Sequence, residues 1–131
     1  MYADSRRHYQ SQAVETAGPA QLVLMLYDGA LAALTRATQA LDPGATEADP
    51  ESANRELQRA QDILTELRVT LDVARGGQIA ANLAALYDFC LEQLLDANIR
   101  KDASELPAVR SVVAGLRDAW ATACCAAPVG G

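Results

Sequence analysis

The chain has 131 residues, half of them hydrophobic, and a formal net charge of −6 at pH 7. This length predicts a single domain that buries a core without help from disulfides or metals. The acidic balance argues against nucleic acid as a partner, because phosphate binding needs a concentrated basic surface.

Residues 1–17 are polar and mixed in charge, with Tyr2, Tyr9 and Val14 as isolated apolar points. We expect an extended or partly disordered arm here, because chain ends are poorly ordered unless other contacts hold them. No apolar stretch follows the charged residues near the N-terminus, so we expect no cleavable secretory signal.

A first helix is predicted from Gly18-Pro19 to about Leu41. Glycine is tolerated at an N-cap and proline suits the first helical position. The segment is more apolar than one buried face requires. It carries two adjacent stripes, which are Leu22, Leu26 and Ala30 in one and Val23, Tyr27 and Leu31 in the other, broadened by Leu24 and Met25. This helix therefore either lies at the centre of the domain or offers a second face to a partner.

A second helix is predicted to start at Asp49-Pro50-Glu51, with an N-cap, a proline and an acid in its first turn. Apolar residues then recur at alternating spacings of four and three, at Ala53, Leu57, Ala60, Leu64, Leu67, Leu71 and Ala74. Such a heptad pattern marks either the core side of a bundle helix or a face that binds a partner helix. We expect Gly76-Gly77 to end it.

Two more helices complete the predicted fold. The third should end near Lys101, and the fourth should be capped by Asp102 or Ser104, with Pro107 in its first turn. Their apolar stripes are Ile79, Leu83, Leu86, Cys90, Leu94 and Ala97 in the third, and Leu106, Val109, Val113, Leu116, Trp120 and Ala123 in the fourth. Short connections between four helices predict an all-α, antiparallel up-down four-helix bundle. We expect residues 1–17 to form the extended N-terminal arm, 18–125 the bundle and 126–131 a frayed tail.

The chain lacks the convergent reactive groups that catalysis needs. Its single histidine, His8, lies in the arm, so neither a di-iron bundle nor a helical phosphotransfer histidine is possible. Cys90, Cys124 and Cys125 are odd in number and poorly spaced for zinc, so no disulfide framework or metal site is expected. We predict a protein that is not an enzyme and has no cofactor. The chain has no run of about 18 apolar residues, so we predict no membrane span. A cytoplasmic location is the simplest interpretation.

Short sequence words stand out once the helices are placed. They are Thr16-Ala17-Gly18-Pro19, Leu24-Met25-Leu26-Tyr27-Asp28-Gly29-Ala30, Ile63-Leu64-Thr65-Glu66-Leu67, Leu71-Asp72, Gly76-Gly77-Gln78-Ile79-Ala80-Ala81-Asn82-Leu83, Leu86-Tyr87-Asp88, Ala97-Asn98 and Leu116-Arg117-Asp118-Ala119-Trp120. In order and spacing, from about Tyr9 to Trp120, they resemble the FliS family of flagellar secretion chaperones. Each word is weak alone, but their order across four helices makes the match specific.

The resemblance implies a cytoplasmic chaperone that binds the disordered C-terminal segment of flagellin. Such a chaperone prevents premature polymerisation and delivers flagellin to the flagellar type III export gate protein. We assign the flagellin groove to Leu22, Met25, Leu26, Tyr27, Leu67, Tyr87 and Asn98, and an export-gate contact to Tyr9 and Val14. We expect a monomer or weak dimer without stable membrane insertion. The alternative is a structural bundle that self-associates through its extra apolar face.

Several of these features carry a second interpretation. Tyr27 and Tyr87 are either half-buried with hydroxyls at the rim, or they hydrogen-bond along the groove. Gly29 serves either close helix packing or close approach of the bound peptide. Trp120 is expected to anchor the core of the fourth helix, and Asn98 either bonds the next loop or lines the groove. The arm is either disordered or covers the empty groove until flagellin displaces it.

Overall fold

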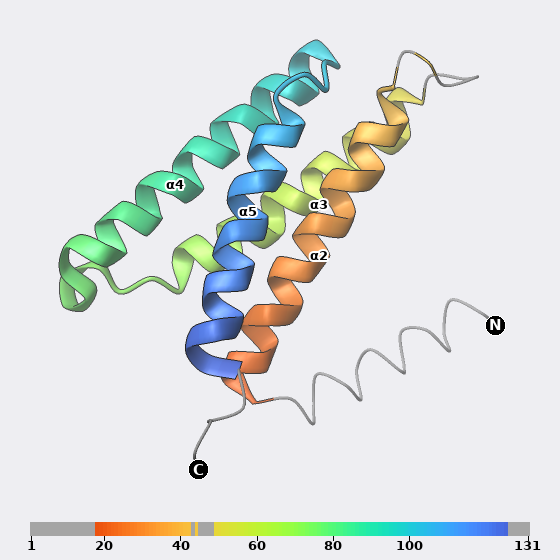
Figure 1. Ribbon diagram of the computed structural model, residues 1–131. Coiled ribbons are helices and arrows are strands. Elements are labelled where there is room, and N and C mark those ends of the chain that lie inside the picture. Colours follow the sequence, from red (N-terminus) through yellow and green to blue (C-terminus); the bar gives the residue numbers. More distant parts are fainter. Residues whose placement is uncertain (1–17, 43, 45–48, 126–131) are drawn as a thin grey trace.

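The computed structural model describes residues 18–42, 44 and 49–125. These residues form four α-helices and a terminal π-helical turn, namely α2 (Pro19–Ala40), α3 (Pro50–Val69), α4 (Val73–Arg100), α5 (Leu106–Trp120) and η1 (Ala121–Cys125). Successive helices run in opposite directions (Figure 1), which confirms the predicted antiparallel, all-α fold. The predicted arm and tail lie outside the described residues.

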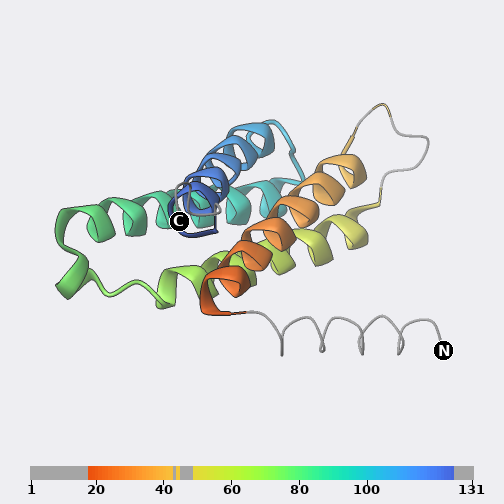
Figure 2. The ribbon, with the colours of Figure 1, turned by 60° about the horizontal axis from the view of Figure 1, so that its bottom comes forward.

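The four helices surround one core. Helix α2 packs along α3 and α5, α3 packs against α4, and α4 closes the arrangement against α5. The hairpin of α3 and α4 projects beyond the N-terminal end of α2 and the C-terminal end of α5, as two views of the molecule show (Figures 1 and 2). The core is therefore deepest in the middle of the bundle, where all four helices overlap.

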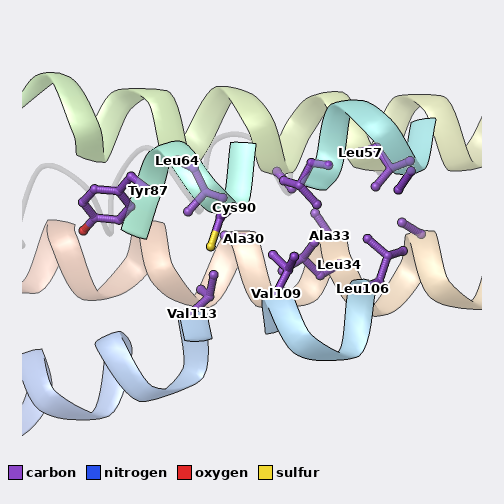
Figure 3. Packing of buried hydrophobic residues seen from close by; sticks show 14 of the residues in the cluster. Ala30, Ala33, Leu34, Leu57, Leu64, Tyr87, Cys90, Leu106, Val109 and Val113 are labelled. Carbon is purple, nitrogen blue, oxygen red and sulfur yellow. The ribbon is translucent and has the colours of Figure 1, made fainter. Parts of the chain in front are cut away.

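Small side chains let the helices approach closely in the core (Figure 3). Helix α2 contributes Ala30, Ala33 and Ala37, which are completely buried. The largest fully buried side chains come from all four helices and are Leu34, Leu57, Leu64, Leu94, Leu106, Val109, Val113 and Cys90. Close approach of the helices multiplies the dispersion contacts between these side chains, and those contacts favour one arrangement of the helices.

The predicted helix starts at Pro19 and Pro50 are confirmed. Asp49 is the N-cap of α3, and its Oδ1 accepts a hydrogen bond from the backbone N–H of Ser52 at 3.0 Å. Gly18 is the N-cap of α2 and supplies no side-chain bond. A side-chain oxygen satisfies one of the free N–H groups of a first turn, so α3 begins with a stronger cap than α2.

The second helix is shorter than its heptad pattern predicts. It ends at Val69, so Leu71 lies in the connection and Ala74 in the first turn of α4. Asp72 starts the new helix by accepting a hydrogen bond from the Arg75 N–H at 3.2 Å. The predicted break also falls inside α4, where Gly77 adopts φ 60°, ψ −139° and kinks the helix after one turn.

The predicted apolar stripe of the third helix is wrong at two positions of its first half, while Leu83 packs against the core as predicted. Ile79 is 75% exposed and Leu86 is 38% exposed. The buried positions there are Ala80, Ala84 and Tyr87 instead. The physical reason is that the start of α4 belongs to the projecting hairpin, where α2 and α5 cover less of the helix (Figures 1 and 2).

The start and end of α5 also differ from prediction. Glu105 is its N-cap and makes no side-chain capping bond. The Asp102 carboxylate instead accepts from the Ser104 N–H at 2.9 Å in the preceding turn, while Pro107 lies in the first turn as predicted. Trp120 is only half-buried, and its Nε1–H donates to the carbonyl oxygen of Ala20 at 2.9 Å. It therefore joins the end of α5 to the start of α2 at the edge of the core.

Candidate functional site

An apolar groove of about 650 Å³ lies between α2 and α3. Its walls are Leu22, Met25, Leu26 and Gly29 from α2, and Arg59, Asp62, Ile63 and Glu66 from α3. Both sets follow the spacing i, i+3, i+4 and i+7, so each lies on one face of its helix. The groove therefore follows about two turns of each helix.

Gly29 forms part of the floor of this groove, at a point where α2 and α3 lie close together. A Cβ atom at Gly29 would lie 3.3 Å from Cδ1 of Ile63. That separation is within tight van der Waals contact, which supports the interpretation of Gly29 as a close-packing residue. Because the same glycine also lines the groove, a larger side chain there would fill the groove as well as separate the helices.

The two walls of the groove differ chemically. Leu22, Met25 and Leu26 on α2 are half-buried and present hydrocarbon. The charged groups, Arg59 and Glu66 among them, all come from α3 and are exposed. The groove thus pairs an apolar wall with a charged rim, as expected for a surface that receives one amphipathic helix.

The structure brings together three of the seven predicted groove residues. Leu22, Met25 and Leu26 line the groove side by side. Tyr27, Leu67 and Tyr87 are buried, with exposed fractions of 4%, 2% and 3%. Those three cannot contact a partner unless the core rearranges. Tyr9 and Val14, the predicted export-gate contacts, lie outside the described residues.

The two tyrosines bond to each other rather than at the rim. The Tyr27 and Tyr87 hydroxyl oxygens are 2.5 Å apart, with one donating to the other. Burial raises the pKa of both side chains, because the phenolate is poorly solvated in the core. Their hydroxyls stay protonated at neutral pH and act as a structural link between α2 and α4.

Asn98 lies away from the groove. Its Nδ2 donates to Asn54 Oδ1 at 2.8 Å, which ties α4 to the N-terminal half of α3. Its Oδ1 accepts from the ammonium group of Lys101, the left-handed C-cap of α4. The side chain therefore hydrogen-bonds a neighbouring helix and the end of its own helix. The sequence had suggested a bond near the helix end but not the bond to α3.

Sequence reasoning assigned only Leu67 of α3 to the groove, and that residue is buried. The α3 wall is instead Arg59, Asp62, Ile63 and Glu66. Ile63 and Glu66 belong to one of the sequence words that resemble the family, which was the available signal. A second set of apolar side chains, all on α4, was missed because the stripe there was misplaced. The exposed large side chains of this helix that fall outside the predicted stripe are Val73, Phe89, Leu95 and Ile99.

Neither a metal site nor a membrane span is evident in the described part of the chain. No group of three or more His, Cys, Asp or Glu side chains there is arranged to hold a metal ion. None of the helices in residues 18–42 and 49–125 is long and apolar enough to cross a bilayer.

Comparisons with known proteins give a consistent result. A family model described as "Flagellar protein FliS" matches residues 1–127. The chain is 39% identical over 112 residues to the flagellar secretion chaperone FliS of Bacillus subtilis, covering 86% of this chain and 80% of the relative. It is 40% identical over 109 residues to the Salmonella typhimurium protein of the same name, covering 82% and 78%. It is also similar to the flagellar secretion chaperone FliSB of Pseudomonas aeruginosa, 32% identical over 125 residues, covering 92% and 96%.

Proposed function

This chain belongs to the FliS family of flagellar secretion chaperones, and from that premise we propose that its α2–α3 groove binds the C-terminal segment of flagellin. Occupation of the groove covers the apolar face that flagellin subunits use in polymerisation, so the client stays unassembled until export. The chain is accordingly a chaperone and not an enzyme, as its residues predicted.

The open groove is the observation that carries this proposal. A disordered client pays about 2–5 kcal/mol to become ordered on binding. Fully burying one large apolar side chain contributes about 1.5–3 kcal/mol, and Leu22, Met25 and Leu26 are already half-buried. These three side chains therefore offset the ordering cost only in part, and the client must supply several apolar anchors of its own.

The experiment is a polar substitution in the groove with a matched control on the same helix. We expect Met25→Gln to weaken binding of a flagellin C-terminal peptide by about tenfold, because an amide is costly to bury without a partner. Leu31 is also half-buried on α2, but it packs against the core and does not line the groove, so Leu31→Gln should lower the stability and leave the affinity of the folded protein nearly unchanged. Calorimetric titration measures the affinity, and circular dichroism checks the helicity.

Two outcomes would contradict the groove assignment. One is unchanged affinity in Met25→Gln. The other is an equal loss of affinity and helicity in both variants, which would identify these residues as core alone. A sizing column separates the remaining alternative, since a chaperone forms a one-to-one complex with the peptide and a self-associating bundle forms dimers without peptide uptake.

The finer steps of the cycle belong to the same proposal. We place the protein in the cytoplasm as a monomer or weak dimer that delivers flagellin to the export gate protein. Tyr9 and Val14 remain the predicted gate contacts within the proposed arm of residues 1–17. If this arm covers the empty groove, its deletion should tighten flagellin binding, whereas an arm without that role should leave the affinity unchanged.

A further inference from the structure

The charged wall of the groove has a polarity along α3. Arg55 and Arg59 lie toward the N-terminal end of α3, while Asp62 and Glu66 lie toward its C-terminal end. We call these four exposed side chains the α3 rim. Eleven residues separate its ends, which corresponds to about 16 Å of helix. The rim therefore presents two positive charges followed by two negative charges beside the apolar wall.

The rim extends the groove rather than standing apart from it. Arg59 and Asp62 line the groove and also a second hollow of about 400 Å³, in which Arg55 takes part. Glu56 lies in the same hollow but is turned toward α2, where its Oε1 is 3.7 Å from Nη1 of Arg36. The two hollows therefore adjoin at Arg59 and Asp62, and we call them together the track, along which the four rim charges lie.

The rim charges have no ion-pair partners within residues 18–42, 44 and 49–125. By contrast, Arg68, two residues beyond Glu66 on the same helix, pairs with Asp88 of α4 at 3.1 Å. Arg59 and Asp62 are three residues apart, a spacing at which opposite charges on a helix can pair, yet they form no ion pair in the structure. The rim is therefore available to charges supplied by another molecule.

We infer that the α3 rim selects the direction and register in which the flagellin segment lies in the groove, by pairing with acidic client residues at Arg55 and Arg59 and with basic ones at Asp62 and Glu66. This inference rests on the proposed function. The apolar wall alone does not distinguish the two directions of an amphipathic helix, because hydrocarbon contacts are non-directional. Charge complementarity at an interface sets register and disfavours the reversed arrangement through like-charge contacts.

Antiparallel packing defines how the two walls face each other. Gly29 meets Ile63, and α2 and α3 run in opposite directions (Figure 2). Leu22 is therefore nearest the Glu66 end of the track, and Arg59 lies on the other side of Gly29. A client helix with an apolar anchor beside Leu22 should carry a basic residue on the flank that faces α3 there, and an acidic residue about two turns away.

The test uses the full chain and the flagellin C-terminal peptide. Glu66→Arg should weaken binding several-fold at low ionic strength, because one favourable pair becomes repulsive. Glu92 on α4 is exposed and outside the groove, so Glu92→Arg makes the same change in net charge and should leave the affinity unchanged. The double variant Arg59→Glu/Glu66→Arg keeps the net charge of wild type and should weaken binding by roughly tenfold, with the difference shrinking as salt screens the rim.

A charge reversal in the flagellin peptide completes the experiment. Replacing each Lys or Arg of the peptide with Glu in turn should identify one position that restores binding to Glu66→Arg. The inference is overturned if Arg59→Glu/Glu66→Arg binds as tightly as wild type, if Glu92→Arg weakens binding equally, or if no client reversal rescues. Failure of the proposed function looks different, since the wild-type chain would then not bind the peptide or Met25→Gln would bind it fully.

Discussion

The hydroxyl groups of Tyr27 on α2 and Tyr87 on α4 bond to each other across the interior of the bundle, with 2.5 Å between the oxygens. Helix α2 packs along α3 and α5, and α4 lies on the far side of the core. The tyrosine pair therefore links two helices that are not close neighbours. Because they face each other in the core, these two tyrosines do not line the groove to which the sequence analysis had assigned them.

Removing both of these hydroxyls should cost less than the sum of the costs of removing each one alone. In Tyr27→Phe the remaining Tyr87 hydroxyl is left buried without its partner, which costs about 1–3 kcal/mol of unfolding free energy. The double variant Tyr27→Phe/Tyr87→Phe has no polar group to leave unsatisfied, so we expect less destabilisation than the sum of the single variants. Urea unfolding followed by circular dichroism measures the three values. Additive effects would show that the hydroxyls do not interact.

The stability of the protein should fall in mildly alkaline solution. Burial raises the pKa of the Cys90 thiol to about 11 from an ordinary value of 9.0. As the pH rises, the unfolded chain releases this proton before the folded chain does. The contribution of the Cys90 thiol to the free energy of unfolding is therefore complete below about pH 9 and is lost as the pH rises toward 11. Burial raises the pKa of Tyr27 and Tyr87 in the same direction, which continues the decline.

Cys90→Ala provides the comparison for this pH dependence. It should be less stable at every pH, because it leaves a cavity in the core, but its stability should fall less steeply between about pH 9 and 10.5. Urea midpoints measured at half-unit pH steps give both slopes. Identical slopes in the two proteins would exclude the thiol as the source.

Filling the floor of the groove should block the client without unfolding the bundle. In Gly29→Leu the new side chain lies against Ile63, whose Cδ1 would be 3.3 Å from the added Cβ, and it occupies the space between the two walls. We expect at least a tenfold loss of flagellin-peptide affinity. Gly29→Ala should change the stability by less than about 1 kcal/mol, since its gain in helix propensity offsets a tight contact with a flexible side-chain end.

Gly115 supplies the matched control for this substitution. It is also a glycine inside a helix, but it is exposed on α5 and a Cβ there meets nothing within 4 Å. Gly115→Leu should therefore bind the peptide as wild type does and unfold at a higher temperature. Loss of binding in both leucine variants would point to a general effect on the fold instead of the groove.

The kink in α4 should depend on glycine at one position. Gly77 has φ 60° and ψ −139°, a conformation that costs a residue with a Cβ about 1–3 kcal/mol. Gly77→Ala should lower the unfolding free energy by that amount, whereas Gly115→Ala should raise it by up to about 1 kcal/mol. Thermal and urea unfolding of the two variants compare them directly. Unchanged stability in Gly77→Ala would mean that α4 tolerates a different path at this point.

Helix starts and the larger part of the core were predictable because their signals are local. Pro19 and Pro50 mark helix starts through backbone geometry alone, and the heptad positions Leu57 and Leu64 are buried as their spacing indicates. The end of α3 was less predictable. Apolar periodicity continues through Leu71, and the pattern records which residues are buried but not whether the helix between them is continuous.

The groove was predictable as a property of α2 but not in its composition. The excess of apolar residues from Leu22 to Leu31 indicated a second face, and Leu22, Met25 and Leu26 do lie on it. Which of the neighbouring residues turn inward depends on how each helix is rotated against the others. Tyr27 is adjacent to the groove residues in sequence, yet it faces Tyr87 in the core.

Taken by itself, the amino-acid sequence determined the four helices of residues 18–125, their antiparallel order and the main core positions, because these follow from local caps, short connections and periodic spacing. The family was indicated separately, by the resemblance of ordered sequence words. Only the tertiary structure decided the exposure of Ile79, the pairing of the two tyrosines and the charged wall from α3. Those features depend on how the packed helices are rotated against one another and on how far the α3–α4 hairpin extends past its neighbours. Both are set by contacts between residues that are distant in sequence, which periodicity along one helix does not encode.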